Sequence, residues 1–258
     1  MPIKQISILF ILIFSILTLN AYSYEDSKIR GEIAFGSFLF SPSGHHSLSG
    51  SNSGTNLGLE SDMGMSDDNA FFGRAKLEPG AGMPGIYINA SIFETKGSGK
   101  KAFTYGDLSF KDTSSYDSKI TLEDYNLSFF YHIKSLTTAT IGRVKLDIGG
   151  TIKWFEAKGT FSQSSVGTVS GSQSDYALAF YADLLIRPVE RVELGIEWNG
   201  LSFTDASFSN ITGRFSYQVM GPFFLSVGYT TKNFNMNKDG FNLDMDTKGA
   251  FLEGGYRF

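Results

Sequence analysis

The fold is decided by the segment Val144-Lys-Leu-Asp-Ile-Gly-Gly-Thr-Ile-Lys-Trp154, in which apolar and polar residues alternate. Successive side chains of an extended strand point to opposite faces, so Leu146 and Trp154 would share one face. Lys145 and Lys153 would share the other. A helix would instead distribute these charges around its circumference. The segment therefore predicts a β-strand with one apolar and one charged face.

The same period of two recurs along most of the chain. With 29 Gly, 24 Phe and 12 Tyr among 258 residues, the composition favours β structure. Hydrophobic residues make up 41% of the chain, which is too apolar for a disordered polymer. We expect ten strands, because a count of eight would leave a strongly alternating segment unused. The expected strands are residues 29–36, 71–78, 86–92, 124–131, 144–154, 176–186, 192–199, 211–219, 225–230 and 250–258.

The connections between these strands alternate between short and long, with one exception at residues 204–208. Short turns at one end and long loops at the other are typical of outer-membrane barrels. The sequence therefore predicts an all-β fold, a transmembrane antiparallel up-and-down β-barrel with short periplasmic turns and long extracellular loops. An even strand count places both termini at the short-turn end. The expected long loops are residues 41–68, 97–117, 157–174 and 233–246.

The start of the chain has a different pattern from the rest. Ile6–Leu19 is an apolar run of 14 residues, shorter than the roughly 20 residues of a membrane-spanning helix. Ala21 and Ser23 place small residues where a signal peptidase reads the chain. We expect a signal peptide at residues 1–23, a barrel domain at residues 24–258, and location in a bacterial outer membrane after cleavage.

The chain ends in Tyr256-Arg257-Phe258. An aromatic residue at the end, with another two positions earlier, resembles the C-terminal signal that outer-membrane barrels present for insertion. The resemblance implies that Tyr256 and Phe258 form this insertion signal. It also implies two partners, outer-membrane lipid and the barrel assembly machinery, which would recognise the last strand.

A wider resemblance covers most of the chain after the signal peptide. Leu57–Glu78 looks like the first loop and second strand of a family of small Gram-negative outer-membrane β-barrel proteins of unknown function. Leu146–Phe155, Glu197–Ser202 and Val227–Tyr229 are similar to later strands of that family. The resemblance implies the barrel fold. The family has no known catalytic residues, so it implies no catalytic site.

The polar faces of the expected strands would line the barrel lumen. Positive and negative side chains are nearly equal in number there, which suggests pairing across the lumen, because unpaired buried charges are costly. Two hypotheses follow from the width of a ten-strand barrel, a salt-bridged interior with small water pockets and a narrow conduit. The expected lumen residues are Arg30, Glu32, Arg74, Lys76, Asp124, Lys145, Asp147, Lys153, Asp183, Glu193, Glu197, Arg214, Glu253 and Arg257.

Composition excludes several kinds of chemistry. The formal net charge of −4 argues against a nucleic-acid partner, because such proteins carry a basic patch. The absence of cysteine excludes disulfides, thiol nucleophiles and a lipoprotein anchor. No sequence pattern indicates a cofactor. The oligomeric state is not indicated either.

The first long loop contains the residues most suited to surface chemistry. His45 and His46 would allow a membrane-embedded hydrolase of lipid or peptide, if other loops supplied the partners. With these histidines, the acidic residues Glu60, Asp62, Asp67 and Asp68 of the same loop would suit a divalent cation. The simpler interpretation is a solvated acidic loop with no metal and no catalytic residue. The sequence therefore favours a passive barrel, either a narrow small-solute pore or a structural and surface barrel, with the hydrolase and ligand-binding loops as alternatives.

Overall fold

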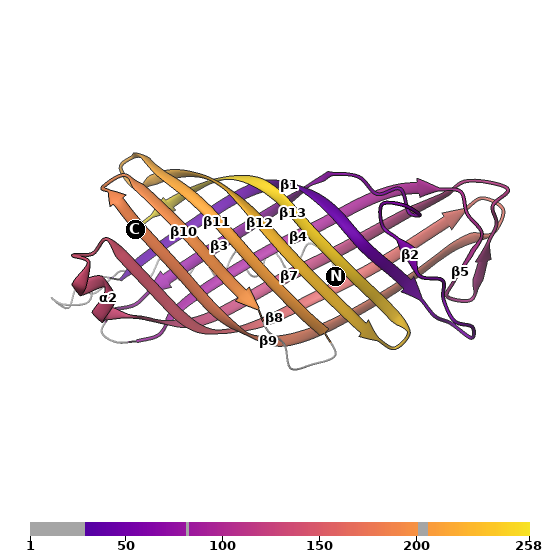
Figure 1. The fold of residues 1–258 in the computed structure, drawn as a ribbon, viewed down its shortest axis with the longest axis horizontal. Helices are drawn as coiled ribbons and strands as arrows, with labels where there is room; N and C mark the ends of the chain where they lie inside the picture. The colour runs from indigo at the N-terminus through magenta and orange to yellow at the C-terminus, as the bar shows by residue number, and fades with distance from the viewer. Residues whose placement is uncertain (1–28, 81–82, 201–205) are drawn as a thin grey trace.

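Ten long antiparallel strands form the wall of a closed barrel in the computed structural model, which describes residues 29–80, 83–200 and 206–258 (Figure 1). This confirms the expected fold class and strand count. Sequence neighbours pair with one another around the wall, so the topology is up-and-down. The wall strands are β1 (Arg30–Leu48), β3 (Asp68–Glu78), β4 (Gly85–Gly99), β7 (Tyr116–His132), β8 (Val144–Gln163), β9 (Gly167–Val189), β10 (Val192–Gly200), β11 (Ala206–Met220), β12 (Phe223–Lys238) and β13 (Phe241–Arg257).

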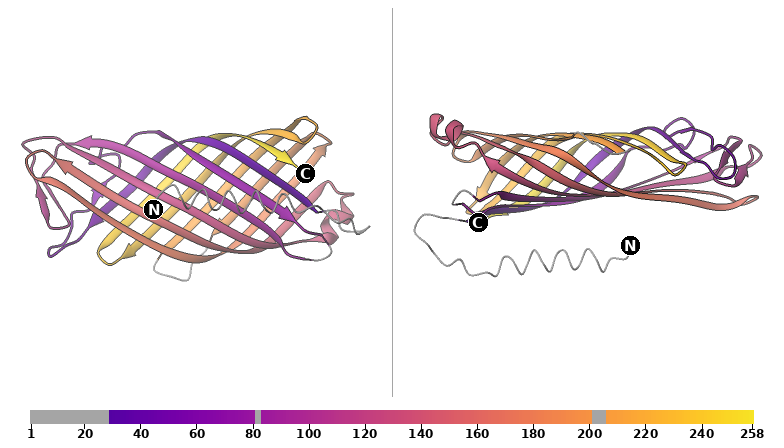
Figure 2. Two further views of the ribbon diagram at one scale, coloured as in Figure 1. Left: turned by 180° about the vertical axis from the view of Figure 1, so that it is seen from behind. Right: turned by 90° about the horizontal axis from the view of Figure 1, so that it is seen from below.

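The barrel closes between its first and last strands. β1 and β13 pair antiparallel from Glu32 with Arg257 to Leu48 with Phe241. Figure 2 shows the continuous wall from behind and from below. Because β1 begins and β13 ends at the same rim, this rim is the predicted short-turn end.

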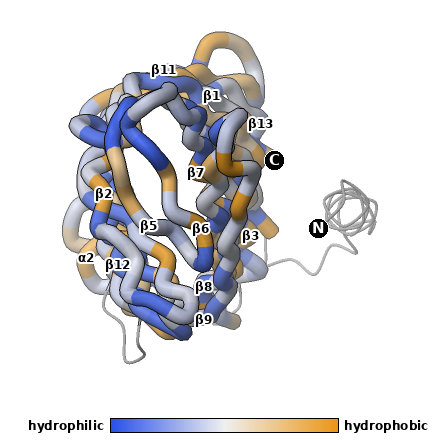
Figure 3. The backbone as a smooth tube through the Cα atoms, turned by 90° about the vertical axis from the view of Figure 1, so that its right-hand side faces the viewer, coloured by the Kyte–Doolittle hydropathy of each residue, from blue (hydrophilic) through white to orange (hydrophobic). Residues whose placement is uncertain are grey.

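Short helical and strand elements lie at both ends of the barrel. The turn between β7 and β8 at the short-turn end contains helix α2 (Lys134–Ala139). At the loop end, the first connection contains β2 (Leu57–Gly58), and the second contains β5 (Phe103–Tyr105) and β6 (Leu108–Phe110). Figure 3 looks along the barrel from this loop end. Within the described residues, no helix is long and apolar enough to span a membrane.

Two of the four expected long loops are strands instead. β8 and β9 remain paired up to Gln163 and Gly167, and β12 and β13 up to Lys238 and Phe241. The expected loops at residues 157–174 and 233–246 were therefore wrong. Tight turns replace them, and Asp239 and Gly240 adopt the positive φ angles of 49° and 77° that a two-residue hairpin turn requires.

The two loops were expected wrongly because the polarity of the two faces inverts along the long strands, as β12 shows. On β12, Val227 and Tyr229 point outward and are about half exposed, as lipid-facing side chains would be. Further along, Asn233 points outward, whereas Phe234 is buried in the lumen. The outer face thus changes from apolar to polar where the wall leaves the membrane. The inner face changes from polar to apolar at about the same level.

Two expectations fall outside the described residues. The signal peptide expected at residues 1–23 is one of them. The short connection expected near residues 204–208 is the other, apart from the beginning of β11.

Candidate functional site: a lumen filled in two layers

Arg74 is the centre of an ionic layer in the half of the lumen nearer the short-turn end. Its guanidinium donates two hydrogen bonds to Glu253, of 2.9 Å from Nε and 2.8 Å from Nη2. It also donates to Glu32 on the neighbouring strand. The side chain of Arg74 is 2% exposed and that of Glu253 is fully buried. One cation therefore joins the first and last strands, on either side of the barrel closure.

Lys76 forms a second centre and reaches across the lumen. Its Nζ lies 2.6 Å from Asp147 on β8 and 2.7 Å from Asp183 on β9. Asp147 also accepts a hydrogen bond of 3.0 Å from Nδ1 of His132. His132 lies at the short-turn rim, and this contact directs its ring toward the lumen. The ion pairs hold β3 against the opposite side of the wall.

Arg257 pairs with carboxylates at the seam between the first and last strands. It donates to Glu32 at 2.8 Å and to Glu193 at 2.7 Å. Arg214 lies between Glu253, at 3.2 Å, and Glu197, at 3.5 Å. These pairs extend the ionic layer over β1, β10, β11 and β13.

A cavity of about 180 Å³ lies among these groups at the short-turn end. Lys145, which pairs with Glu78 and Asp147, lines it, as does Arg30 at the exposed mouth. The structure therefore places most of the expected lumen residues in one ionic layer. The members are Arg30, Glu32, Arg74, Lys76, Lys145, Asp147, Asp183, Glu193, Glu197, Arg214, Glu253 and Arg257.

The remaining two expected lumen residues, Asp124 and Lys153, lie further up the lumen. Lys153 donates a hydrogen bond to Asp124. Lys232, which the sequence analysis did not identify, approaches the other oxygen of Asp124 at 3.3 Å. Lys232 was missed because the strand was expected to end before it.

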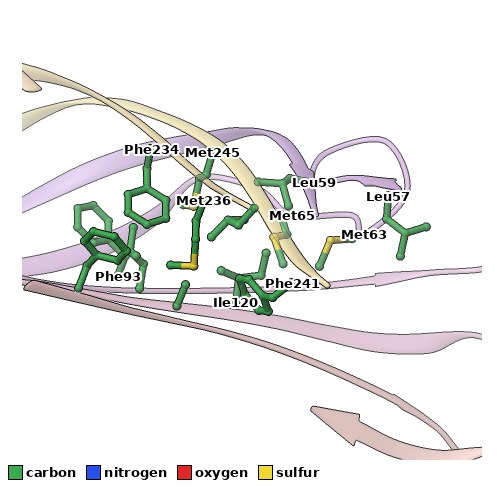
Figure 4. Close-up of a cluster of buried hydrophobic side chains, with 14 of the residues drawn as sticks. Leu57, Leu59, Met63, Met65, Phe93, Ile120, Phe234, Met236, Phe241 and Met245 are labelled. Atoms are coloured by element: carbon green, nitrogen blue, oxygen red, sulfur yellow. The ribbon is translucent and has the colours of Figure 1, made fainter. Parts of the chain in front are cut away.

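Above this triad the lumen is apolar. Phenylalanine, methionine and leucine side chains from the inner faces of the wall strands fill it. Leu57, Leu59, Met63 and Met65 of the first loop fold inward and are almost completely buried among them (Figure 4). The loop that was expected to be a solvated acidic segment therefore contributes an apolar plug.

The signal for this apolar layer is present in the sequence. Phe241, Leu243 and Met245 alternate with Asn242, Asp244 and Asp246, which is strand periodicity with apolar residues inside. A rule that places apolar residues on the lipid-facing side of a strand interprets this inverted pattern as a loop.

His46 is buried within the loop-end cap, beyond the membrane-spanning part of β1. Its Nδ1 lies 2.7 Å from the carbonyl oxygen of Asn242, which can only accept, so Nδ1 donates. Nε2 therefore accepts from the hydroxyl of Tyr105 at 2.6 Å. Burial lowers the pKa of His46 to about 4 and raises that of Tyr105. The neutral ring therefore links β1, β5 and β13 through these two hydrogen bonds.

The acidic residues of the first loop do not assemble into a metal site. Among the described residues, no group of three or more His, Asp or Glu side chains is arranged to hold a metal ion. Asp62 instead pairs with Lys101 at 2.7 Å, and this contact lowers the pKa of Asp62.

No family model matches the chain, and no curated protein matches it. Solved structures of outer-membrane barrels do resemble it. The outer-membrane protease OmpT of Escherichia coli is 11% identical, with 93% of this chain and 99% of that chain covered and a TM-score of 0.49. The attachment invasion locus protein Ail of Yersinia pestis, solved in complex with the heparin analogue sucrose octasulfate, is 12% identical, with coverage of 90% and 99% and a TM-score of 0.40.

The translocator domain of the autotransporter NalP of Neisseria meningitidis is 11% identical, with 98% of this chain and 96% of that chain covered and a TM-score of 0.41. At these identities the likeness concerns the fold alone. The closed ten-strand wall and its apolar outer belt define the chain as a small outer-membrane-type β-barrel.

Proposed function

We propose that the protein is a closed barrel of the bacterial outer membrane, with a structural and surface role and no open pore at rest. One observation carries this proposal: an ionic layer and an apolar layer are stacked in the same lumen. Arg74 and Lys76 bridge the wall in the lower layer. Phe155, Phe234 and Leu59 are buried in the upper layer.

The cavities that remain in the lumen support this proposal. A cavity of about 30 Å³ lies at the upper edge of the ionic layer and one of about 20 Å³ lies beside Asp124 and Lys153, and each has room for roughly one or two waters. A hydrated ion would have to cross the apolar layer without partners for its charge, which is costly. The larger cavity of about 180 Å³ lies among the ion pairs at the short-turn end.

The ends of the chain support the proposed location. Signal-peptide cleavage after residue 23 would deliver the chain for outer-membrane insertion. The side chains of Tyr256 and Phe258 are partly exposed at the short-turn rim, and the ring of Phe223 packs 5.3 Å from that of Tyr256. We infer that the barrel assembly machinery binds this last strand.

A surface hydrolase built around His46 is less well supported. A catalytic histidine needs access to a substrate and a carboxylate or nucleophile as its partner. Both ring nitrogens of His46 are instead occupied by Tyr105 and a backbone carbonyl, and the ring is buried.

Planar-bilayer recording of the purified protein tests the proposal. The folded protein, identified by its heat-dependent gel shift, should show no discrete conductance. The double variant Phe155→Ala, Phe234→Ala is the positive control, because it removes two rings that pack 4.7 Å apart in the apolar layer and should produce a leak. A stable, discrete conductance of the unaltered protein would contradict the proposal.

A further inference from the structure

Three cavities follow one another along the lumen from the short-turn end. The largest, of about 180 Å³, has the exposed Arg30 at its mouth. The second, of about 30 Å³, shares Glu197 and Arg214 with the first. The third, of about 20 Å³, shares Asn210 and Lys232 with the second. Because neighbouring cavities have wall residues in common, the three form one series that begins at the short-turn rim and ends beside Lys232.

Short polar side chains make room for the second cavity. On the inner faces of β11 and β12, the hydroxyl groups of Thr212 and Thr230 lie 2.9 Å apart, and Thr230 donates a hydrogen bond of 3.0 Å to the side chain of Asn210. All three residues line the cavity. Hydroxyl and amide groups offer hydrogen-bond partners to water, and about 30 Å³ is the space of one or two waters. The second cavity therefore suits water and excludes larger solutes.

Two buried polar atoms on the wall of the first cavity have no hydrogen-bond partner among the described residues. One is the acceptor Oδ1 of Asp183, and the other is the donor Nε of Arg214, which lies 3.2 Å from Glu253 outside hydrogen-bonding geometry. The side chains of Asp183 and Arg214 are 5% and 9% exposed. Buried polar groups are normally satisfied by protein atoms or by ordered water. Water both donates and accepts, so water in the first cavity can satisfy both atoms.

The series stops beneath the apolar layer. The third cavity has Asp124 and Lys232 on its polar side and Phe155, Phe234 and Met245 on the other. The rings of Phe155 and Phe234 meet edge to face with their centres 4.7 Å apart. Water or an ion that moved further would lose its polar partners, which is costly. Within the described part of the chain, the path therefore ends at this level.

We propose that the lower lumen is a half-channel, a water-filled path that opens to the periplasm and ends at Lys232. Water enters from the short-turn end and passes between the ion pairs of the ionic layer. An ion follows only if it is no larger than a water molecule. The apolar layer alone then keeps the barrel closed. The half-channel is an addition to the closed-barrel function, because a barrel with a dry, solid ionic layer would be closed as well.

Single cysteines and Ag⁺ test the half-channel, because the chain contains no cysteine and Ag⁺ is no larger than a water molecule. Thr230→Cys places a thiol on the second cavity. Thr95→Cys is the matched control, a buried threonine beside Ile120 of the apolar layer that lines none of the three cavities. In nanodiscs and chloride-free buffer, Ag⁺ should cap Thr230→Cys at least about tenfold faster than Thr95→Cys, because entry of a cation into an apolar layer is costly. A fluorescent maleimide, added after denaturation, labels the thiols that remain free.

The two capping rates separate the half-channel from the closed barrel. The heat-dependent gel shift shows whether each variant is folded. Slow capping of both folded variants would overturn the half-channel and leave the closed barrel intact. Fast capping of both would overturn the half-channel and the closed barrel together, because Ag⁺ would then reach the apolar layer as well.

Phospholipid vesicles show from which end the probe enters. A membrane-impermeant maleimide on Asn235→Cys, which faces outward above the membrane, gives the fraction of barrels whose loop end faces the outside. Ag⁺ added outside should cap Thr230→Cys only in the remaining fraction, whose short-turn end faces out. Capping of the loop-out fraction instead would overturn the proposed opening to the periplasm.

A block of the second cavity tests its continuity with the third. Thr247→Cys places a thiol on the third cavity, and Thr212→Leu adds bulk to the wall of the second. Capping of Thr247→Cys should be about tenfold slower in the Thr212→Leu background and unchanged with Thr212→Val, which keeps the volume of threonine. Unchanged capping in a folded Thr212→Leu variant would overturn the proposed path.

Discussion

Replacing Glu253 by glutamine tests the ionic layer at a carboxylate whose side chain is fully buried. Glutamine keeps the volume and one acceptor oxygen, but it removes the charge and turns an amide NH₂ group toward the guanidinium of Arg74. The change removes one of the two hydrogen bonds of 2.8 and 2.9 Å and weakens the contact with Arg214 at 3.2 Å.

Removing one partner from a buried ion pair costs about 3–5 kcal/mol. Arg74 still has Glu32 as a partner in the variant, and a cavity of about 180 Å³ beside it can admit water. We therefore expect the lower end of that range, a loss of about 3 kcal/mol in the free energy of unfolding.

Urea unfolding in phospholipid vesicles, followed by the fluorescence of Trp154 and Trp198, measures this loss. Glu94→Gln is the matched control, because Glu94 pairs with Lys96 and Lys119 at the surface and its side chain is 43% exposed. An exposed pair of this kind contributes less than about 1 kcal/mol. Equal losses in the two variants would refute the claim that the lower layer is a buried ionic network.

Three further changes test other parts of the structure. Val227→Arg places a charge on the lipid-facing side of β12 and should lower the free energy of unfolding in vesicles by about 2–4 kcal/mol. Asn233→Arg, which faces outward on the same strand but above the membrane, should lower it by less than about 1 kcal/mol. Similar losses in the two variants would contradict the polarity inversion. Because burial lowers the pKa of His46 from 6.5 to about 4, the unfolded cap binds the proton more tightly. Cap stability should thus fall by about 3 kcal/mol as the pH drops from 6.5 to 4. Hydrogen exchange measures this fall, and the variant His46→Gln should show none. Gly159→Ala would place a Cβ 2.2 Å from Nε2 of His46 and should loosen the cap to proteolysis, whereas Gly213→Ala, with open space around it, should not.

The membrane-spanning part of the fold could be predicted from the sequence because lipid and lumen impose opposite polarities on the two faces of each strand. In Val144–Trp154 every second residue is apolar, and the structure places these residues on the outer face. The same rule placed Glu32 and Arg257 in the lumen, and antiparallel closure made them neighbours.

The upper half of the lumen could not be predicted by the same rule. Above the membrane, water surrounds the wall and apolar side chains turn inward, so Phe234 and Met236 follow the pattern of a soluble core. Nor does the sequence show that Met63 and Met65, in a loop rich in acidic residues, would fold into the barrel. Such contacts join residues that are far apart in the chain, and the periodicity of a single segment carries no information about them.

The absence of cysteine in the chain makes single-cysteine labelling the most direct test of the closed lumen. We would place one cysteine at Val227, Asn235 or Met236, which face lipid, water and the upper lumen respectively. A membrane-impermeant maleimide, applied to intact outer membranes, should label Asn235→Cys rapidly and the other two slowly or not at all. Labelling of Met236→Cys as fast as Asn235→Cys would show that solutes reach the upper lumen, and the closed barrel would be contradicted.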